Sequence, residues 1–217
     1  MVKAVVLDVD GTLMDTNYLH VEAWARALEE VGHRASRVEI HPKIGKGSSL
    51  LVSELVENDD DAANKVDELH SEYYSEMQKH AYPLPGAREL MDSLSKQDYQ
   101  VWLATSADPE ELEISIEALE AEGKLAGIVN SSDVEESKPA PDIFGLALEQ
   151  AGVEAQEAVA VGDAIWDVES AKAAGVRVVA VLTGGAFSKE DLKEAGAIGV
   201  YEDCAELLES GFPEWVR

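Results

Sequence analysis

Two aspartates near the start of the chain have the types and spacing to do chemistry. Asp8 and Asp10 follow a valine-rich run, residues 3–7, and precede Gly11. Such a run is typical of a buried parallel strand, and period-two alternation turns both acids to one side and Val9 to the other. Converging, dehydrated carboxylates favour a hard divalent cation such as Mg²⁺. The alternative is a pair of solvated turn acids, since Asp and Gly are common in turns.

Further polar side chains follow later strand-like runs. They are Thr105 and Ser106 after residues 101–104, Lys138 in a later loop, and Asp163 and Asp167 after residues 158–161. Because parallel strands all run the same way, the residues just past their ends collect along one edge of the sheet. Carboxylates, hydroxyls and one positive charge at a shared edge suit a phosphate bound to Mg²⁺.

Each of these later residues also has a purely structural interpretation. Thr105 and Ser106 are of the types that pack or cap at the end of a strand. Lys138 is alternatively an exposed loop lysine, the common state of that residue type. Asp163 and Asp167 lie four residues apart, and acids at a helix N-terminus stabilise the helix without doing chemistry.

The segments that must position these residues alternate between helical and strand patterns. Strands are predicted at residues 3–7, 101–104, 127–130, 158–161, 178–182 and 198–201, and helices at 87–94, 110–121, 142–151, 165–174, 190–194 and in the tail. Asp108, Pro109 and Glu111 have the pattern of a helix N-cap, a proline at the first position and a capping-box partner. The alternation predicts an α/β fold, a doubly wound, Rossmann-like parallel sheet with a helical bundle inserted after the first strand.

The predicted helical bundle occupies residues 16–82. Three apolar faces at helical spacing mark it: Leu19, Ala23, Trp24, Ala27, Leu28 and Val31; Leu50, Leu51, Leu55 and Val56; and Val66, Leu69, Tyr73 and Met77. Gly32 is a helix stop, and the two prolines of residues 82–86 form a boundary that no helix crosses. We therefore expect a core domain of residues 1–15 and 83–217 and a helical domain of residues 16–82.

Composition narrows the class of protein. The 217 residues carry a formal net charge of -27, from 44 acids against 17 bases, which offers no basic footprint for nucleic acid or an anionic membrane. Solvated helix surface explains the excess acid, and salt adaptation is an alternative. Cys204 is the only cysteine, which fits a reducing compartment. Asp8 and Asp10 interrupt the N-terminal apolar run, so we expect no signal peptide and a cytoplasmic protein, monomeric or a small homo-oligomer.

Four short motifs resemble those of the haloacid dehalogenase superfamily, in the same order. They are DVDGT at residues 8–12, ATS at 104–106, SKP at 137–139 and VGDAIWD at 161–167. The match covers nearly the whole chain. The helical insertion lies where members resembling β-phosphoglucomutase and phosphoglycolate phosphatase carry an α-helical cap domain. One DxDGT motif is moderately specific, and all four together are a strong signal.

The resemblance implies catalytic and metal-binding roles for the acids. Asp8 is expected to be the nucleophile that forms an aspartyl-phosphate, and Asp10 the acid that protonates the leaving alkoxide and later activates water. Asp10 must then be protonated part of the time while Asp8 stays ionised. Mg²⁺ is expected on Asp8, the backbone carbonyl of Asp10, and Asp163, with Asp167 orienting these groups from just outside the ligand set.

The resemblance also implies a phosphate site. Thr105, Lys138 and backbone N–H groups near Gly11 and Ser106 are expected to bind the phosphate oxygens, with Thr12 in the same motif as Gly11. In the cap, Lys46 lies in the glycine-rich turn 45–49 and is expected either to contact substrate or to belong to a plain connecting loop. His20 lies one turn before Trp24, as in the mutase-like members; the alternatives are acid–base assistance and an ordinary helix histidine.

These observations lead to a Mg²⁺-dependent phosphatase of a small phosphorylated metabolite. A sugar-phosphate mutase is the alternative, although residues 68–74 lack the lysine that mutase-like members carry there, and His70 is the nearest substitute. A phospho-accepting signalling domain without turnover is an alternative of another class. Asp10 and the helical insertion both disfavour it.

Overall fold

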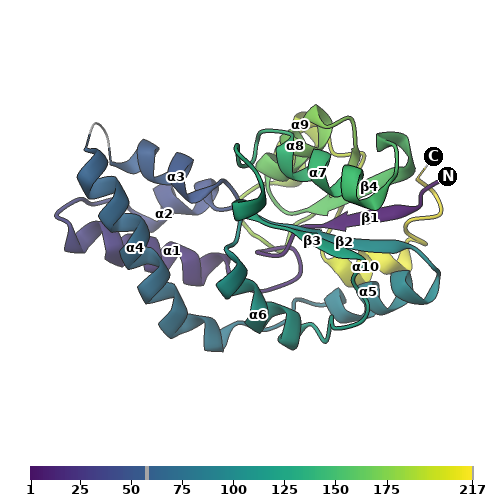
Figure 1. The fold of residues 1–217 in the computed structure, drawn as a ribbon, viewed down its shortest axis with the longest axis horizontal. Helices are drawn as coiled ribbons and strands as arrows, with labels where there is room; N and C mark the ends of the chain where they lie inside the picture. Colours follow the sequence, from purple (N-terminus) through teal and green to yellow (C-terminus); the bar gives the residue numbers. More distant parts are fainter. Residues whose placement is uncertain (57–58, 217) are drawn as a thin grey trace.

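The computed structural model describes residues 1–56 and 59–216, and its centre is a six-stranded parallel sheet (Figure 1). The strands are β1 (Ala4–Leu7), β2 (Gln100–Ala104), β3 (Gly127–Val129), β4 (Ala158–Gly162), β5 (Arg177–Val181) and β6 (Gly199–Tyr201). Their order, β3-β2-β1-β4-β5-β6, reverses direction between β1 and β4. In open α/β sheets a ligand crevice lies outside the carboxyl ends of the strands at such a switch point.

Helices cover both faces of the sheet, as the alternating pattern predicts (Figure 1). One face packs against α5 (Ala87–Lys96), α6 (Pro109–Ala118) and α10 (Cys204–Glu209), and the other against α7 (Asp142–Ala151), α8 (Ile165–Ala173) and α9 (Lys189–Ala195). Alternate residues of β1 enter opposite cores: Val5 and Leu7 lie with the first set of helices, and Ala4 and Val6 with the second. The doubly wound α/β prediction is confirmed.

The insertion after β1 is helical. It contains α1 (Asn17–Glu30), α2 (Arg37–Ile40), α3 (Ser48–Leu55) and α4 (Asp60–Met77), with short 3-10 turns at His41–Lys43 and Gln78–His80. Its apolar residues form a third core, separate from the two that flank the sheet, with Trp24 and Leu28 of α1 facing Val66 and Leu69 of α4. Figure 1 shows this bundle beside the strand ends. The domain boundaries at 15/16 and 82/83 stay a prediction.

Some details of the helices differ from the pattern-based expectation. Leu50 is 42% exposed, and Val52 takes its place in the core beside Leu51. Neighbouring residues point about 100° apart on a helix, so the buried face of α3 accommodates Leu51 but not Leu50. Helix α6 ends at Ala118 rather than at residue 121, and Glu120 has left-handed backbone torsion, with φ of 53°. The four-residue helix α2 was not predicted.

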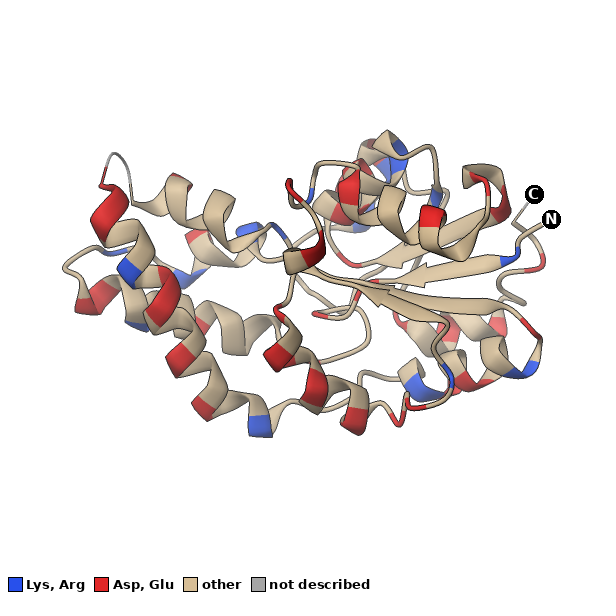
Figure 2. Ribbon diagram, viewed as in Figure 1, with Lys and Arg blue, Asp and Glu red and all other residues tan. Residues whose placement is uncertain are grey.

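Acidic positions are spread over the helices of both the bundle and the α/β part (Figure 2). This distribution fits the expectation that the excess acid is solvated helix surface, since charged residues favour the solvent-facing side of a helix. Within residues 1–56 and 59–216, no helix combines the length and apolar character needed to cross a bilayer.

The entry into α5 provides a test of the fold. Gly86 has φ of +79°, and a Cβ there would lie 2.1 Å from the backbone nitrogen of Ala205. Gly86→Ala should therefore lower the free energy of unfolding by about 3 kcal/mol, from left-handed strain plus overpacking, measured by urea denaturation. Gly152→Ala is the matched control, because Gly152 has φ of +65° but no atom within 4 Å of the added methyl; it should cost about 1 kcal/mol. Equal losses would contradict the packing of α10 against α5.

Candidate active site

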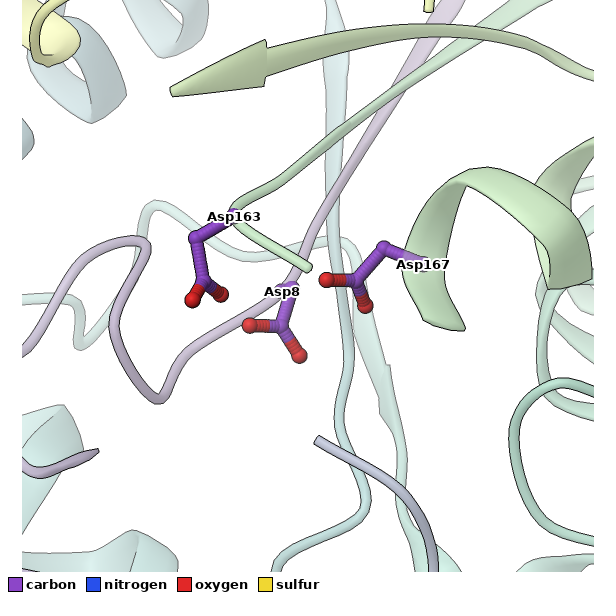
Figure 3. A group of neighbouring side chains, drawn as sticks. All are labelled: Asp8, Asp163 and Asp167. Atoms are coloured by element: carbon purple, nitrogen blue, oxygen red, sulfur yellow. The ribbon is translucent and has the colours of Figure 1, made fainter. Parts of the chain in front are cut away.

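Three carboxylates converge at the switch point of the sheet. Asp8 directly follows β1, Asp163 follows β4, and Asp167 lies in the first turn of α8. Each is at most 6% exposed, and each offers an oxygen within 4.8 Å of the others. Figure 3 shows the three side chains turned toward a common centre. The interpretation of Asp8 as a solvated turn residue is therefore wrong. Asp167 belongs to the same group of converging oxygens as Asp8 and Asp163, the two acids whose carboxylates were expected to bind the metal.

Lys138 neutralises part of this cluster. Its Nζ lies 2.6 Å from Asp8 Oδ1 and 2.7 Å from Asp167 Oδ1, and it donates to the carbonyl oxygen of Ala104 at 2.9 Å. The side chain is fully buried, so the exposed-loop alternative is wrong. Burial favours the neutral amine, but Asp167 and Asp8 outweigh it and raise the pKa of Lys138 above its ordinary value.

Asp163 is held by hydrogen bonds from other side chains. The Thr12 hydroxyl lies 3.1 Å from its Oδ1 and 3.0 Å from Asp8 Oδ2, so one hydroxyl bridges the two acids. The amide of Asn17, the first residue of α1, donates to Asp163 Oδ2 at 3.1 Å. At Gly184 a Cβ would lie only 1.7 Å from the same oxygen. Sequence reasoning missed Asn17, which no motif marked.

The protonation of this cluster indicates an excess of negative charge. Burial, reinforced by Asp167, raises the pKa of Asp8 to about 7 although Lys138 opposes the shift. Burial and the neighbouring acids also raise the pKa of Asp163 well above its ordinary value. Three carboxylates share one lysine, so the site has uncompensated charge and oxygen donors at the spacing that a hard divalent cation accepts. The donor set fits Mg²⁺.

Asp10 has different surroundings from Asp8. The Thr16 hydroxyl donates to Asp10 Oδ1 at 2.6 Å, and His20 Nε2 lies 3.4 Å from the same oxygen. Burial alone would raise the pKa of Asp10, but the charge and hydrogen bond of His20, with Thr16, lower it below its ordinary value. The two acids therefore do differ, as expected, but in this structure it is Asp10 whose ionised form is stabilised.

His20 belongs to a stack of rings that joins α1 to α4. Its Nδ1 lies 3.1 Å from Nε2 of His70, and its ring stacks on Tyr74 with centroids 3.9 Å apart. The His70 ring in turn stacks on Trp24 at 3.7 Å. Burial, aided by His20, lowers the pKa of His70 well below its ordinary value, so His70 is the neutral member of the pair. An ordinary surface position for His20 is excluded, since it is 7% exposed.

The remaining predicted residues lie around this centre with their own partners. Thr105 is buried at the end of β2, and its hydroxyl oxygen accepts the Ala107 N–H at 3.1 Å. The Gly11 N–H donates to the carbonyl of Met14 at 2.8 Å, so Gly11 has no spare backbone proton for phosphate in this conformation. The phosphate-binding roles of Thr105, Gly11 and Thr12 stay predictions.

Two of the predicted residues lie where the helical bundle meets the sheet. The Ser106 hydroxyl donates to the carbonyl of Gly45 at 3.1 Å. Lys46 forms an ion pair with Glu54 at 2.5 Å, and its ammonium lies 4.0 Å from the ring centroid of Trp166. Both therefore bridge the two parts of the chain, and substrate contact by Lys46 stays a prediction.

A pocket opens between the bundle and the strand ends, directly beside the aspartates. Its lining comprises Asp8, Asp10, His20, Trp24, Ile44, Gly45, Lys46, Ser48, Leu51, Asp67, His70, Ser71, Ser106, Ala107, Asp108 and Glu111. Sequence reasoning anticipated Asp8 and Asp10, the two acids expected to be catalytic, and also His20, Lys46 and Ser106 there. It missed Asp67 and Ser71 on α4, and assigned Glu111 only a capping role, which it also has: the Asp108 N–H donates to its carboxylate at 3.4 Å.

The fold and the acid–lysine cluster define a family, and comparison with known proteins identifies it. Residues 5–181 match the family described as haloacid dehalogenase-like hydrolase. The chain belongs to this family, as the four motifs indicated.

Relatives extend the similarity to nearly the full length. A phosphoglycolate phosphatase from Rhodospirillum rubrum is 29% identical over 226 aligned positions, which cover 99% of this chain and 93% of that protein. A phosphorylated carbohydrates phosphatase from Thermotoga maritima is 30% identical, covering 91% of this chain and 93% of that protein. The crystal structure of a hydrolase from Pseudomonas syringae superposes with a TM-score of 0.91 at 34% identity, covering 96% and 97% of the two chains.

The lysine–carboxylate cluster predicts a stability change that depends on pH. Lys138→Met leaves Asp8 and Asp167 without a counter-charge, and should cost about 3–5 kcal/mol of unfolding free energy. The folded-state pKa of Asp8, already raised to about 7, would rise further. A raised carboxyl pKa stabilises the fold at low pH, and this contribution is lost as pH rises. The loss should therefore be larger at pH 8 than at pH 6 in urea denaturation with EDTA present.

Two controls accompany this variant. Lys138→Arg keeps the charge and should lose less stability than Lys138→Met. Lys65→Met removes an exposed lysine paired with Glu68 at 3.0 Å, and should cost less than about 1 kcal/mol at both pH values. A loss from Lys138→Met that is equal at the two pH values would contradict the proposed charge balance.

Proposed function

We propose that this protein is a Mg²⁺-dependent phosphatase that hydrolyses small phosphorylated metabolites through an aspartyl-phosphate on Asp8. The observation that carries the proposal is the buried cluster of Asp8, Asp163, Asp167 and Lys138 at the edge of a pocket. Membership of the haloacid dehalogenase-like hydrolases supports it. So do the names of the relatives, which include phosphatases of phosphoglycolate and of phosphorylated carbohydrates.

The carboxylates of Asp8 and Asp163 would hold the metal, together with the backbone carbonyl of Asp10. Asp167 is within reach of the same ion, and its pairing with Lys138 at 2.7 Å also positions the lysine. When bound, Mg²⁺ supplies positive charge that favours the ionised form of Asp8 and stabilises the charge on the transferring phosphate.

The chemistry proposed for the aspartates is balanced in two steps. A carboxylate oxygen of Asp8 attacks phosphorus and forms the acyl phosphate, while the ester P–O bond breaks and the leaving alkoxide takes a proton from Asp10. Water, deprotonated by Asp10, then attacks phosphorus and releases phosphate and the free Asp8 carboxylate. Because the surroundings of Asp10 stabilise its ionised form, Asp10 must first take up a proton, and His20, 3.4 Å away, is placed to supply it. Lys138 would stabilise the charged phosphate oxygens.

The helical segment of residues 16–82 would act as a cap that encloses the substrate over a core of residues 1–15 and 83–217. Contacts across this division support the assignment: the Trp166 indole donates to the carbonyl of Pro42 at 2.9 Å, and His41 Nε2 lies 2.9 Å from the carbonyl of Gly184. The cap contributes much of the pocket lining, so the choice of substrate would lie largely there.

Replacement of the nucleophile is the first test of this function. Asp8→Asn should lower phosphate release from p-nitrophenyl phosphate by at least about a thousandfold, because an amide does not form the acyl phosphate. Asp61→Asn, an exposed aspartate in the first turn of α4, should leave the rate unchanged. Substantial turnover by Asp8→Asn would remove Asp8 as the nucleophile. Wild-type release of p-nitrophenol that stops at one equivalent per chain, with the phosphate kept on the protein, would favour the signalling alternative. Dependence of the rate on a bisphosphate primer would favour the mutase.

Metal dependence provides a second test. EDTA should abolish phosphate release, and Mg²⁺ should restore it. Gly184→Ala should raise the Mg²⁺ concentration for half-maximal activity on the order of tenfold, because the added methyl displaces the Asp163 carboxylate. Gly145→Ala is the control, since a Cβ on this α7 glycine meets no atom within 4 Å. Unchanged rates in EDTA would refute the metal assignment.

A further inference from the structure

The end of the pocket that lies beyond the aspartates carries additional acids. Asp67 projects from α4, and Asp108 and Glu111 lie at the start of α6, so carboxylates line the pocket from both the bundle and the α/β part. Figure 2 shows acidic positions on both α4 and α6. We call the part of the lining that contains Asp67, Asp108 and Glu111 the acidic wall. A substrate whose phosphate lies at Asp8 must direct the rest of the molecule along this wall.

The lysines in and beside this part of the pocket are already paired with carboxylates. Among the described residues that line the pocket, Lys46 is the one lysine or arginine, and its ammonium is paired with Glu54 at 2.5 Å. His70, which also lines the pocket, is buried and neutral. Lys138 is bound between Asp8 and Asp167. His20, a further basic side chain of the lining, is paired with Asp10 at 3.4 Å. A second anionic group on the substrate would therefore meet carboxylates while each of these positive charges is already paired.

Glu111 shows how unfavourable negative charge is at this position. Burial, with smaller contributions from Asp10 and Asp108, raises the pKa of its carboxyl to about 7 even though His20 opposes the shift. A substrate carboxylate placed beside it would likewise lose hydration and would be repelled by the neighbouring acids.

The polar groups on the wall suit a hydroxylated molecule. Ser48 and Ser71 of the bundle and Ser106 of the sheet edge bear hydroxyls, and the carboxylates of Asp67 and Glu111 accept hydrogen bonds from substrate hydroxyls. Trp24, Ile44 and Leu51 contribute apolar surface. Polar groups set beside apolar side chains are typical of a small-molecule site.

We propose that the pocket selects monophosphates of uncharged, hydroxylated alcohols, such as polyols or sugars, and rejects substrates that carry a carboxylate or a second phosphate. The inference rests on the proposed phosphatase function and specifies its substrate class. If this selection holds, phosphoglycolate is a poor substrate, and a mutase cycle, which passes through a bisphosphate, is disfavoured.

Matched substrate pairs test the selection. 2-Hydroxyethyl phosphate and 2-phosphoglycolate differ only in a hydroxymethyl group against a carboxylate. Sorbitol 6-phosphate and 6-phosphogluconate form a second pair with the same difference. The uncharged member of each pair should have a kcat/KM at least about tenfold higher, the equivalent of ~1.4 kcal/mol. Equal or higher kcat/KM for the carboxylates, or a preference for phosphoethanolamine over 2-hydroxyethyl phosphate, would overturn the proposal.

Variants locate the selectivity on the wall. At pH 8, where the Glu111 carboxyl with its pKa of about 7 is ionised, Glu111→Gln and Asp67→Asn, alone and combined, should shrink the kcat/KM ratio of each pair several-fold. Each substitution then removes a negative charge with little change in shape. Glu113→Gln is the matched control: Glu113 lies on the same helix, is exposed, and does not line this pocket. It should leave the ratios unchanged. Unchanged ratios in the combined variant would show that the wall does not select.

A binding measurement separates this inference from the proposed function. Failure of the wild type to turn over p-nitrophenyl phosphate with Mg²⁺ would refute the phosphatase assignment. Calorimetric titration of Asp8→Asn protein with 2-hydroxyethyl phosphate and with 2-phosphoglycolate tests the pocket without turnover. Tighter binding of the uncharged compound supports the selection, whereas equal or tighter binding of 2-phosphoglycolate refutes it even if the enzyme is active.

Discussion

The buried ion cluster of Lys138 with Asp8 and Asp167 is the constraint on which the rest of the site depends. Taking these charges out of water is unfavourable unless each is closely paired. The paired atoms come from the residue directly after β1, the loop before α7 and the first turn of α8. The parallel sheet brings these segments together at its switch point. One lysine leaves the carboxylates under-compensated, and that excess of negative charge suits the site to a divalent cation.

The sequence alone was sufficient to predict most of this centre. Asp8, Asp163 and Asp167 follow short apolar runs, and strand ends in a parallel sheet share one edge, so local patterns implied a long-range contact. The motif around Lys138 predicted that it lies there. In the structure, Lys138 donates a hydrogen bond to the carbonyl of Ala104, the residue directly before Thr105, which was predicted to lie in the same site. The sheet and its covering helices followed from the same alternation of strand and helix patterns.

What the sequence did not predict depends on how separate helices meet. Asn17 reaches Asp163 only because α1 packs beside the β4 loop, and His70 reaches His20 only because α1 and α4 pair along their lengths. Neither contact has a local signature. The capping role of Glu111 follows from its neighbours in the sequence, whereas its place in the pocket lining depends on how α6 packs beside the helical bundle. Leu50 was misplaced because an apolar pair on a short helix does not reveal which member faces inward.

The position of α1 links access to the pocket with the completeness of the acid cluster. Asn17 and His20 belong to the helical segment, yet they complete the surroundings of Asp163 and Asp10 on the sheet side. Any swing of this helix that widens the entrance withdraws both side chains from their acids. In an open form, the Asn17 amide and the His20 imidazole would therefore no longer contact Asp163 and Asp10. The complete site would then exist only in the closed form, with the substrate enclosed and bulk water excluded.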